Sequence, residues 1–301
     1  MRALVTGSCG FLGSRICEAL LAHGYEVFGI DDLSTGRKEN FPAGGHLEVA
    51  DIRDMVDKPG YSDKVDVVYH LAASYKDRSD WERDASVNVN GTINVVREAQ
   101  RTGAKIVYFN TSLCYGKSPA SPVQTDAPLA PEGSYAVSKT AGEAYIRDSG
   151  VPYVSLRLAN IYGPRNLSGP IPTFYKRLSE GKPCTVVDSR RDFVYVDDLV
   201  WVAVNAAKQG SGVYHVSSGS DYSILDIYHA VSQAMGIDPP DPTVVPRGTD
   251  DVATLLLDPS ETEREFGWKA MTPFEDGVAK AVAYYEDFGV PETYTHLAVN
   301  R

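Results

Sequence analysis

Cysteine is scarce in this sequence. Its 301 residues include four cysteines, and these form neither a C-x-x-C pair nor another spacing typical of metal ligands (Cys9, Cys17, Cys114 and Cys184). We therefore expect reduced thiols, the usual state in the cytoplasm, and no metal site. A cytoplasmic location also agrees with the N-terminus, where we expect a strand to begin at once instead of a signal peptide.

Positive charge and long apolar runs are lacking as well. The 29 lysines and arginines are outnumbered by 40 aspartates and glutamates, which gives a formal net charge of −11. This balance argues against nucleic acid or an anionic membrane as the main partner, although it leaves room for a local positive pocket that binds phosphate. Because no apolar run is long enough to cross a bilayer, we expect no membrane span. The hydrophobic fraction of 43% is typical of a soluble globular protein with one large or two closely packed domains.

A glycine pattern stands at the start of the chain, in MRALVTGSCGFLG. Gly7, Gly10 and Gly13 follow the apolar run Ala3-Leu4-Val5 and precede the amphipathic stretch 14–23. This order predicts a strand, a tight turn and a helix, with the backbone open to a pyrophosphate and the helix N-terminus presenting free N–H groups to it. On its own the pattern is also compatible with an ordinary strand-to-helix turn.

An acidic pair ends the second expected strand. The apolar run 25–30 leads to Asp31 and Asp32, about 20 residues after the glycines, where a dinucleotide fold holds the adenosine ribose. A carboxylate there repels a 2′-phosphate, which favours NAD over NADP. Arg37 and Lys38 follow closely and weaken that preference.

Strands and helices alternate up to about residue 165, which predicts an α/β fold with a doubly wound parallel Rossmann sheet. The expected strands lie at 3–5, 25–30, 46–51, 65–71, 105–110 and 151–158, and long helices at 14–23, 85–103 and 135–150. Beyond residue 165 proline and glycine become frequent, and short strands mix with helices. We therefore expect a nucleotide-binding domain at 1–165, with segments returning to it near 191–218, and a smaller C-terminal α/β substrate lobe at 166–301.

Tyr135 and Lys139 form a pair suited to proton chemistry. They are four residues apart in an expected helix and so share one face. A neighbouring ammonium and an oxidised nicotinamide would both favour the phenolate of a tyrosine, whose ordinary pKa is about 10. Thr111 or Ser112, just after an expected strand, could hold the substrate hydroxyl while a proton leaves it. A Y-x-x-x-K pair alone is also common on solvated helix faces.

A series of short segments covers nearly the whole chain in a fixed order: TGSCGFLG at 6–13, DDLSTG at 31–36, DIRD at 51–54, HLAA at 70–73, NVNGT at 88–92, TSLCYG at 111–116, YAVSK at 135–139, NIYGPR at 160–165, RDFVYVDD at 191–198 and FGW at 266–268. With these segments the sequence resembles the extended short-chain dehydrogenases/reductases that act on nucleotide-diphosphate sugars. The resemblance implies NAD as the cofactor and a nucleotide-diphosphate sugar, in the first place a UDP-sugar, as the substrate. It also implies a homodimer joined through the helices near 85–102 and 135–150.

The resemblance assigns roles to single residues. Tyr135 is expected to be the catalytic acid/base, with Lys139 and Thr111 as its catalytic partners. The expected cofactor contacts are Gly7, Gly10, Phe11, Leu12, Gly13, Asp31, Asp32, Ser34, Thr35, Gly36, Asp51, Ile52, Leu71, Ala72, Ala73, Asn88, Tyr135 and Lys139. The expected substrate contacts are Ser74, Thr111, Ser112, Tyr135, Asn160, Arg191 and Arg247. Asn160 could instead cap a helix, and Arg191 and Arg247 could form solvated salt bridges.

The residues just before Tyr115-Gly116 bear on the reaction. Dehydratases and decarboxylases of this family generally carry an acid at the place of Ser112 or Leu113, and neither residue can exchange a proton with carbon. The expected reaction is therefore 4-epimerisation through a transient 4-keto sugar. A dehydratase, decarboxylase or reductase on the same substrate class stays open, and a catalytically silent NAD sensor disagrees with an intact Thr111, Tyr135 and Lys139.

The charged loop 74–78 is expected to touch the sugar. Lys76 and Arg78 would suit a carboxylate, such as that of a uronic acid, although solvated loop charges are an equally good reading.

Overall fold

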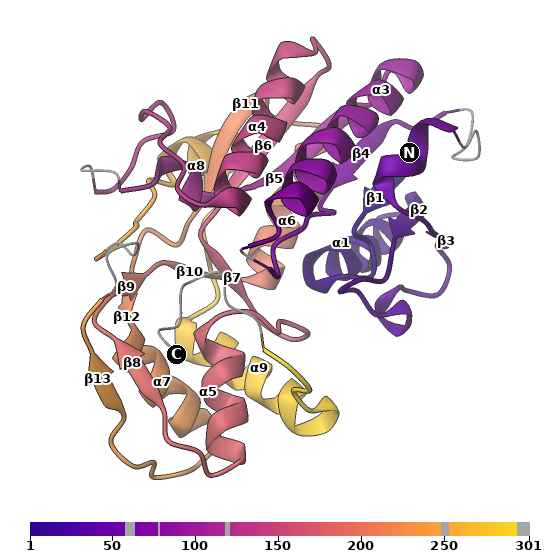
Figure 1. The fold of residues 1–301 in the computed structure, drawn as a ribbon. Coiled ribbons are helices and arrows are strands. Elements are labelled where there is room, and N and C mark those ends of the chain that lie inside the picture. Colours follow the sequence, from indigo (N-terminus) through magenta and orange to yellow (C-terminus); the bar gives the residue numbers. More distant parts are fainter. Residues whose placement is uncertain (58–63, 78, 118–120, 248–252, 294–301) are drawn as a thin grey trace.

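The computed structural model describes residues 1–57, 64–77, 79–117, 121–247 and 253–293, and its centre is one parallel sheet. The sheet has seven strands in the order β11-β6-β5-β4-β1-β2-β3 (Figure 1). All neighbouring strands in it run parallel. The strands are β1 (Arg2–Thr6), β2 (Glu26–Asp31), β3 (His46–Val49), β4 (Val67–His70), β5 (Lys105–Thr111), β6 (Tyr153–Leu158) and β11 (Gly212–Val216). The expected Rossmann-like α/β fold is confirmed.

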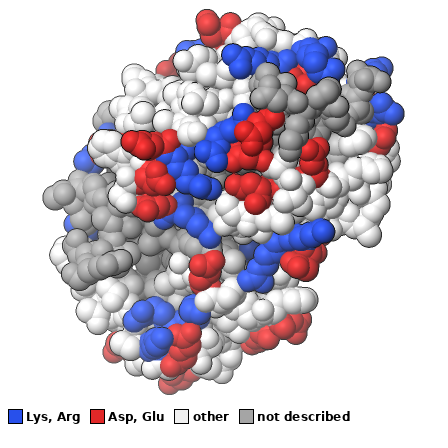
Figure 2. Space-filling view, turned by 45° about the vertical axis from the view of Figure 1, so that its right-hand side comes forward, with Lys and Arg blue, Asp and Glu red and all other residues white. Residues whose placement is uncertain are grey.

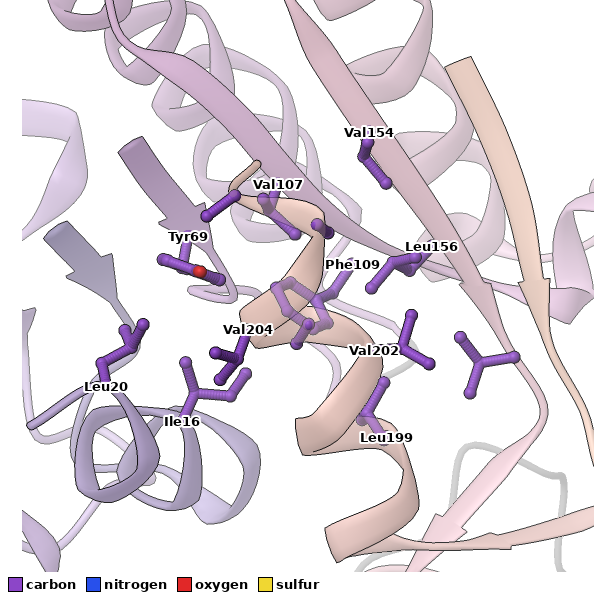
Figure 3. Packing of buried hydrophobic residues seen from close by; sticks show 14 of the residues in the cluster. Ile16, Leu20, Tyr69, Val107, Phe109, Val154, Leu156, Leu199, Val202 and Val204 are labelled. Atoms are coloured by element: carbon purple, nitrogen blue, oxygen red, sulfur yellow. The ribbon is translucent and has the colours of Figure 1, made fainter. Parts of the chain in front are cut away.

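Helices cover both faces of the sheet. On one face α1 (Phe11–Ala22) packs against α6 (Val196–Ala206), and their apolar side chains meet those of the sheet in a shared core (Figure 3). On the other face lie α3 (Thr92–Thr102) and α4 (Ser134–Asp148). Strand side chains alternate between these two cores, since Ala3 and Val5 belong to the first and Leu4 to the second. Burial on both faces explains why the strands read as nearly unbroken apolar runs.

The helical segment before α3 starts earlier than the sequence indicated. Asp80 accepts a hydrogen bond from the Arg83 amide and so caps α2 (Trp81–Ala85). A π-helical turn, η3 (Ser86–Gly91), then joins α2 to α3 without a break. The remaining short helical turns are η1 (Lys38–Asn40), η2 (Ile52–Asp57) and η4 (Ser112–Tyr115).

A second group of elements has a core of its own, below the sheet in Figure 1. It contains α5 (Pro170–Ser179), α7 (Ile224–Ala234) and α9 (Phe274–Phe288), with Phe174, Tyr228, Val278 and Tyr285 among the packed side chains. Three short two-stranded pairs accompany these helices: β7 (Asn160–Tyr162) with β10 (Phe193–Tyr195), β9 (Arg190–Arg191) with β12 (Tyr222–Ser223), and β8 (Thr185–Val187) with β13 (Thr243–Val245). Helix α8 (Ser260–Phe266) lies apart from this group and packs against β11 of the large sheet.

In the described part of the chain, none of the helices combines the length and apolar character needed to cross a bilayer. The same residues contain no cluster of His, Cys, Asp and Glu suited to a metal ion. All four cysteines are buried, free thiols.

Candidate active site

The glycine turn joins β1 to α1 with very little room to spare. Gly7 has a φ of +68°, and a Cβ on Gly13 would lie 2.0 Å from the Gly7 carbonyl oxygen. The N-cap of α1 is Gly10, which has no side chain to bond the first amides of the helix. These amides are therefore open to an anion, as expected for a pyrophosphate site.

Asp31 ends β2 directly beside this turn. Its carboxylate accepts hydrogen bonds from the Cys9 and Leu33 amides, both at 2.8 Å, and its residue is 7% exposed. Burial is the main influence on the pKa of Asp31 and raises it, while the two amide bonds act in the opposite direction. A carboxylate has room for about four hydrogen bonds, so Asp31 can still accept from a ribose hydroxyl while it braces the turn. Asp32 is more exposed and accepts from the Ser34 amide and hydroxyl.

A cavity of 1540 Å³ runs along the carboxyl ends of the strands, from the glycine turn to the second group of elements. Its volume exceeds the range of about 300–1,000 Å³ typical of a site for one small ligand, so it has room for two. Most of the expected cofactor contacts line it: Gly7, Gly10, Phe11, Leu12, Gly13, Asp31, Asp32, Ser34, Thr35, Asp51, Ile52, Leu71, Ala72, Ala73, Tyr135 and Lys139. Most expected substrate contacts do so too: Ser74, Thr111, Ser112, Tyr135, Asn160 and Arg191.

Tyr135 and Lys139 both stand in the cavity wall, on the first turns of α4. Burial lowers the pKa of Lys139 to about 7, against the opposing charge of Glu143, and the ammonium nitrogen lies 4.1 Å from the centre of the Tyr108 ring. The pKa of Tyr135 is raised, first by burial and then by the charges of Tyr75 and Asp84. Lys139 by itself does not offset the burial of the phenol, in agreement with the expectation that an oxidised nicotinamide adds a second positive charge. The phenol needs a further positive charge nearby to act as a base at neutral pH.

Thr111 ends β5 opposite this pair and is held by its neighbours. Its amide donates to the Asn110 side chain at 2.8 Å, and the Asn110 amide group donates to the Glu143 carboxylate at 2.7 Å. Since Glu143 belongs to α4, this chain of bonds ties the position of Thr111 to the helix that carries Tyr135 and Lys139. The Thr111 hydroxyl also accepts from the Leu113 amide.

Three expected contacts do not line the cavity. Gly36 packs behind the glycine turn, where a Cβ would lie 2.8 Å from Cys9. Asn88 is 1% exposed and joins the Ser74 backbone to the Ser138 hydroxyl of α4 at 2.9 Å, so it braces the wall from behind. Arg247 is exposed, just beyond the end of β13, although its neighbour Pro246 reaches the cavity.

Asn160 lies in strand β7, so the alternative that it caps a helix is wrong. Its amide group donates to the Asp192 carbonyl oxygen at 3.0 Å. The buried His70 bonds Thr6 and Thr92 through its two ring nitrogens, which agrees with a structural role.

Comparison with known proteins identifies the family. Residues 3–219 match the model of the NAD dependent epimerase/dehydratase family. The chain belongs to this family. The crystal structure of the Bordetella bronchiseptica enzyme WbmG, solved with NAD and UDP, is 42% identical over 99% of both chains with a TM-score of 0.91. That of WbmH from the same organism, solved with NAD⁺, is 44% identical over 96% of this chain and 99% of that chain, with a TM-score of 0.90. A UDP-glucose 4-epimerase of Mycolicibacterium smegmatis is 32% identical over 95% of this chain and 99% of its own length.

The cavity of this epimerase/dehydratase family member fits NAD, its cofactor. Close approach of backbone to a pyrophosphate needs glycine at the turn, and Gly7, Gly10 and Gly13 each face backbone atoms within 3.2 Å of a built Cβ. Asp31 supplies the acceptor for a ribose, and Lys139 and Tyr135 lie further along the same wall. The expected cofactor is thus confirmed by the family and agrees with the residues present.

Acids in the cavity wall are concentrated away from Thr111. Among its described lining residues, the glycine-turn side has Asp31 at the end of β2, Asp32 just after it and Asp51 after β3. The Asp77 carboxylate accepts hydrogen bonds from the Ser79 amide and hydroxyl, and the exposed Glu132 forms an ion pair with Lys117 at 3.3 Å. Leu113, where relatives that remove water or carbon dioxide are expected to carry an acid, also lines the cavity.

Several lining residues were not foreseen from the sequence. They come from the second group of elements and include Phe174, Arg177, Thr185, Val245, Tyr284 and Phe288. These residues share no motif, and only the packing of α5, α9, β8 and β13 brings them together. Lys76 of the charged loop also lines the cavity and pairs with Glu292 at 3.6 Å, whereas Arg78 lies outside the described residues.

Proposed function

We propose that this protein interconverts the two C4 epimers of a UDP-sugar with tightly held NAD. The observation that carries the proposal is the continuous cavity, which joins the glycine turn, the trio Thr111, Tyr135 and Lys139, and the second group of elements. The family supports the dependence on NAD, and the relatives named as a UDP-glucose 4-epimerase and solved with UDP support the substrate class.

The two parts of the chain divide the ligands between them in this proposal. Residues 1–165, with returning segments near 191–218, hold the dinucleotide, and residues 166–301 mainly hold the nucleotide sugar. In support, β11 and α6 pack into the core of the large sheet, while α5, α7 and α9 share a separate core. Asn160 and Arg191 are then diphosphate ligands, and Arg247 stays a prediction from its motif alone.

The chemistry of this chain's residues is proton transfer and positioning. Tyr135 takes the proton of the C4 hydroxyl and later returns it, and Thr111 holds that hydroxyl in reach. Lys139 bonds the nicotinamide ribose and adds positive charge beside the phenol. NAD held by the glycine turn and Asp31 would supply the hydride chemistry at C4.

Epimerisation is preferred to elimination because the wall beside the sugar lacks a suitable acid among the described residues. Loss of water or of carbon dioxide needs a group that exchanges protons beyond C4, and Leu113 has none. The alternative of a dehydratase, decarboxylase or reductase requires another residue to supply this group. Mass spectrometry separates the two, because epimerisation alone leaves the mass of the sugar nucleotide unchanged.

We also propose a cytoplasmic homodimer. The four free, buried thiols are consistent with a reducing compartment. Two large side chains, Val137 and Tyr145, are each 50% exposed on α4, one of the two helices expected to form the interface.

The deciding experiment incubates the purified protein with a panel of UDP-sugars and no added cofactor. We expect NAD to be released on denaturation and one substrate to yield its C4 epimer. Tyr135→Phe should lower turnover at least 10²-fold while NAD stays bound, because the phenol oxygen is the proton carrier. Tyr145→Phe, on the exposed side of the same helix, is the control and should leave turnover unchanged. A product of lower mass, net reduction of added NAD, or full activity of Tyr135→Phe would contradict the proposal.

A further inference from the structure

Asp84 is a buried acid that the site described above does not use. It is 1% exposed, and its Oδ1 atom has no hydrogen-bond partner among the described residues. Burying a carboxylate oxygen without a partner is costly, so a protein rarely keeps one by accident. Because its neighbours on α2, Arg83 and Ala85, are exposed, Asp84 is the side chain of this turn that points inward.

The direction in which Asp84 points follows from its helix. It comes four residues before Asn88, so the two side chains project from nearly the same side of the continuous segment formed by α2 and η3. Asn88 faces α4, where it bonds the Ser138 hydroxyl at 2.9 Å. The helix α2 likewise packs against α4. Asp84 therefore lies against the start of α4, where Tyr135 comes three positions before Ser138.

In the part of the chain that the structure describes, charged and titratable groups approach Tyr135 from four segments. The ring of Tyr75, in the loop after β4, lies edge-on to the Tyr135 ring, with 6.3 Å between the ring centres. The Lys139 side-chain nitrogen lies over the Tyr108 ring of β5. Lys139 and Glu143 follow on α4 itself. From α2 comes Asp84, whose charge acts on Tyr135 in the same direction as burial does and raises its pKa.

We propose that Asp84 is a positioning residue of the reaction, a buried negative charge that keeps the Tyr135 phenol able to take its proton back. The inference rests on the proposed role of Tyr135 as acid and base. Epimerisation passes through the ketone in both directions, so the phenol must release and recover a proton in each cycle. Lys139 and the cofactor's positive charge favour release, and a base that binds protons too weakly would be slow to protonate the product. Asp84 acts in the opposite direction to these cations.

The first test titrates Tyr135 in the NAD-bound protein without any sugar. The ultraviolet absorbance of phenolate is followed against pH, and the same protein with Tyr135→Phe provides the background. Asp84→Asn should lower the midpoint of Tyr135 by about one pH unit, because it removes a nearby buried charge at nearly constant shape. Glu82→Gln removes an equal charge from the exposed side of the same short helix and should leave the midpoint unchanged.

The second test follows turnover against pH with the epimerised sugar. In Asp84→Asn the acid limb of the profile should move to lower pH by the same amount, since the phenolate persists further into acid. Asp84→Glu keeps the charge and should restore the midpoint, and Asp84→Ser replaces the Asn variant if that protein does not fold. Since the titration needs no sugar, it decides the role of Asp84 even if no UDP-sugar is turned over.

The unfolding temperature distinguishes this proposal from a purely structural role of Asp84. A buried carboxylate with an oxygen that lacks a hydrogen-bond partner costs free energy, so Asp84→Asn should unfold at the same temperature as the parent or higher. An unchanged Tyr135 midpoint in Asp84→Asn, or a lower unfolding temperature together with an unshifted midpoint, overturns the proposal.

Discussion

Glu143 and Arg157 form an ion pair almost fully removed from solvent, with side chains 5% and 4% exposed. Ser155 and Asn110 complete the hydrogen bonds of the carboxylate at 2.6 and 2.7 Å. Arg157 also donates to the Tyr115 hydroxyl, which in turn is paired with His215 of β11. A buried pair of this kind stabilises little in itself, but losing one partner leaves the other charge stranded. The network joins α4, β5, β6 and β11 behind the proposed catalytic residues.

We predict that Glu143→Gln lowers the free energy of unfolding by about 3 kcal/mol at neutral pH, because Arg157 then stays buried without its counter-charge. Urea unfolding measures the change. Glu26→Gln is the control, since Glu26 pairs with Arg2 at 2.7 Å but both side chains are more than 40% exposed. Such a surface pair is worth about 0–1 kcal/mol. Equal losses in the two variants would contradict a special role for the buried pair.

The effect of Glu143→Gln should also depend on pH. Burial by itself raises the pKa of Glu143, but hydrogen bonds from Arg157, Ser155 and Asn110 and the charge of Arg157 outweigh it, so that the pKa is lowered. A carboxyl whose pKa is lower in the folded state contributes stability above its unfolded pKa of about 4.3 and loses it as pH falls through the folded value. The gap between parent and variant should therefore be full at neutral pH and shrink in acid. A gap that widens on acidification would refute this sign.

Sequence reasoning found the site residues that stand in motifs and missed those that act from behind them. The spacing predicts that Tyr135 and Lys139 act together, the family resemblance adds Thr111, and the structure brings all three to one cavity. Asp84, Glu143 and Arg157 carry no spacing signal, since an acid or arginine within a helix or strand reads as a solvated charge until its neighbours are known. Arg177 and Tyr284 were missed for a related reason, because α5 and α9 reach the cavity only through tertiary packing.

At the scale of elements, buried strands and amphipathic helices were predictable and local irregularities were not. The strands β1 to β6 and the helices α1 and α4 lie close to their expected ranges, because burial gives the strands nearly unbroken apolar runs and the helices a clear period. The π-helical turn η3, the pair β9–β12 and strand β13, which pairs with β8, were not foreseen. Strands of two or three residues are too short for a period, and a π-turn differs from an α-helix by one residue.

The turn before α1 yields a prediction at the same scale. Gly13→Ala should abolish NAD retention, because its Cβ would lie 2.0 Å from the Gly7 carbonyl oxygen and force the turn to open. Gly24→Ala is the matched change at the far end of α1. Its φ of +75° makes alanine strained there, at a cost of about 1–2 kcal/mol, but the space around it is open. Both variants should be less stable, and only Gly13→Ala should release no NAD on denaturation. Retention of NAD by Gly13→Ala would mean that the turn does not hold the pyrophosphate.

At the scale of the whole molecule, the surface carries charged side chains of both signs as well as exposed apolar side chains. Lysine and arginine side chains are mixed with aspartate and glutamate over the face shown in Figure 2, as on an ordinary solvated surface. The sheet and the second group of elements both contribute to the cavity wall, so a ligand that fills it contacts both. Exposed large apolar side chains, in contrast, include a pair on α4, Val137 and Tyr145, next to the helix α3 with which α4 packs.

This pair allows a test of the proposed homodimer. Tyr145→Glu should halve the mass measured by light scattering, because a charge would be buried opposite its own copy across a two-fold axis. Trp201→Glu introduces the same charge at a residue of similar exposure, 46% against 50%, on α6 at the other face of the sheet. That variant should keep the mass of the parent. Because Tyr145 is half exposed and lies ten residues after Tyr135, about 15 Å along α4, a monomeric Tyr145→Glu protein should still retain NAD. A parent that is already monomeric, or a dimer that survives Tyr145→Glu and dissociates with Trp201→Glu, would move the interface away from α4.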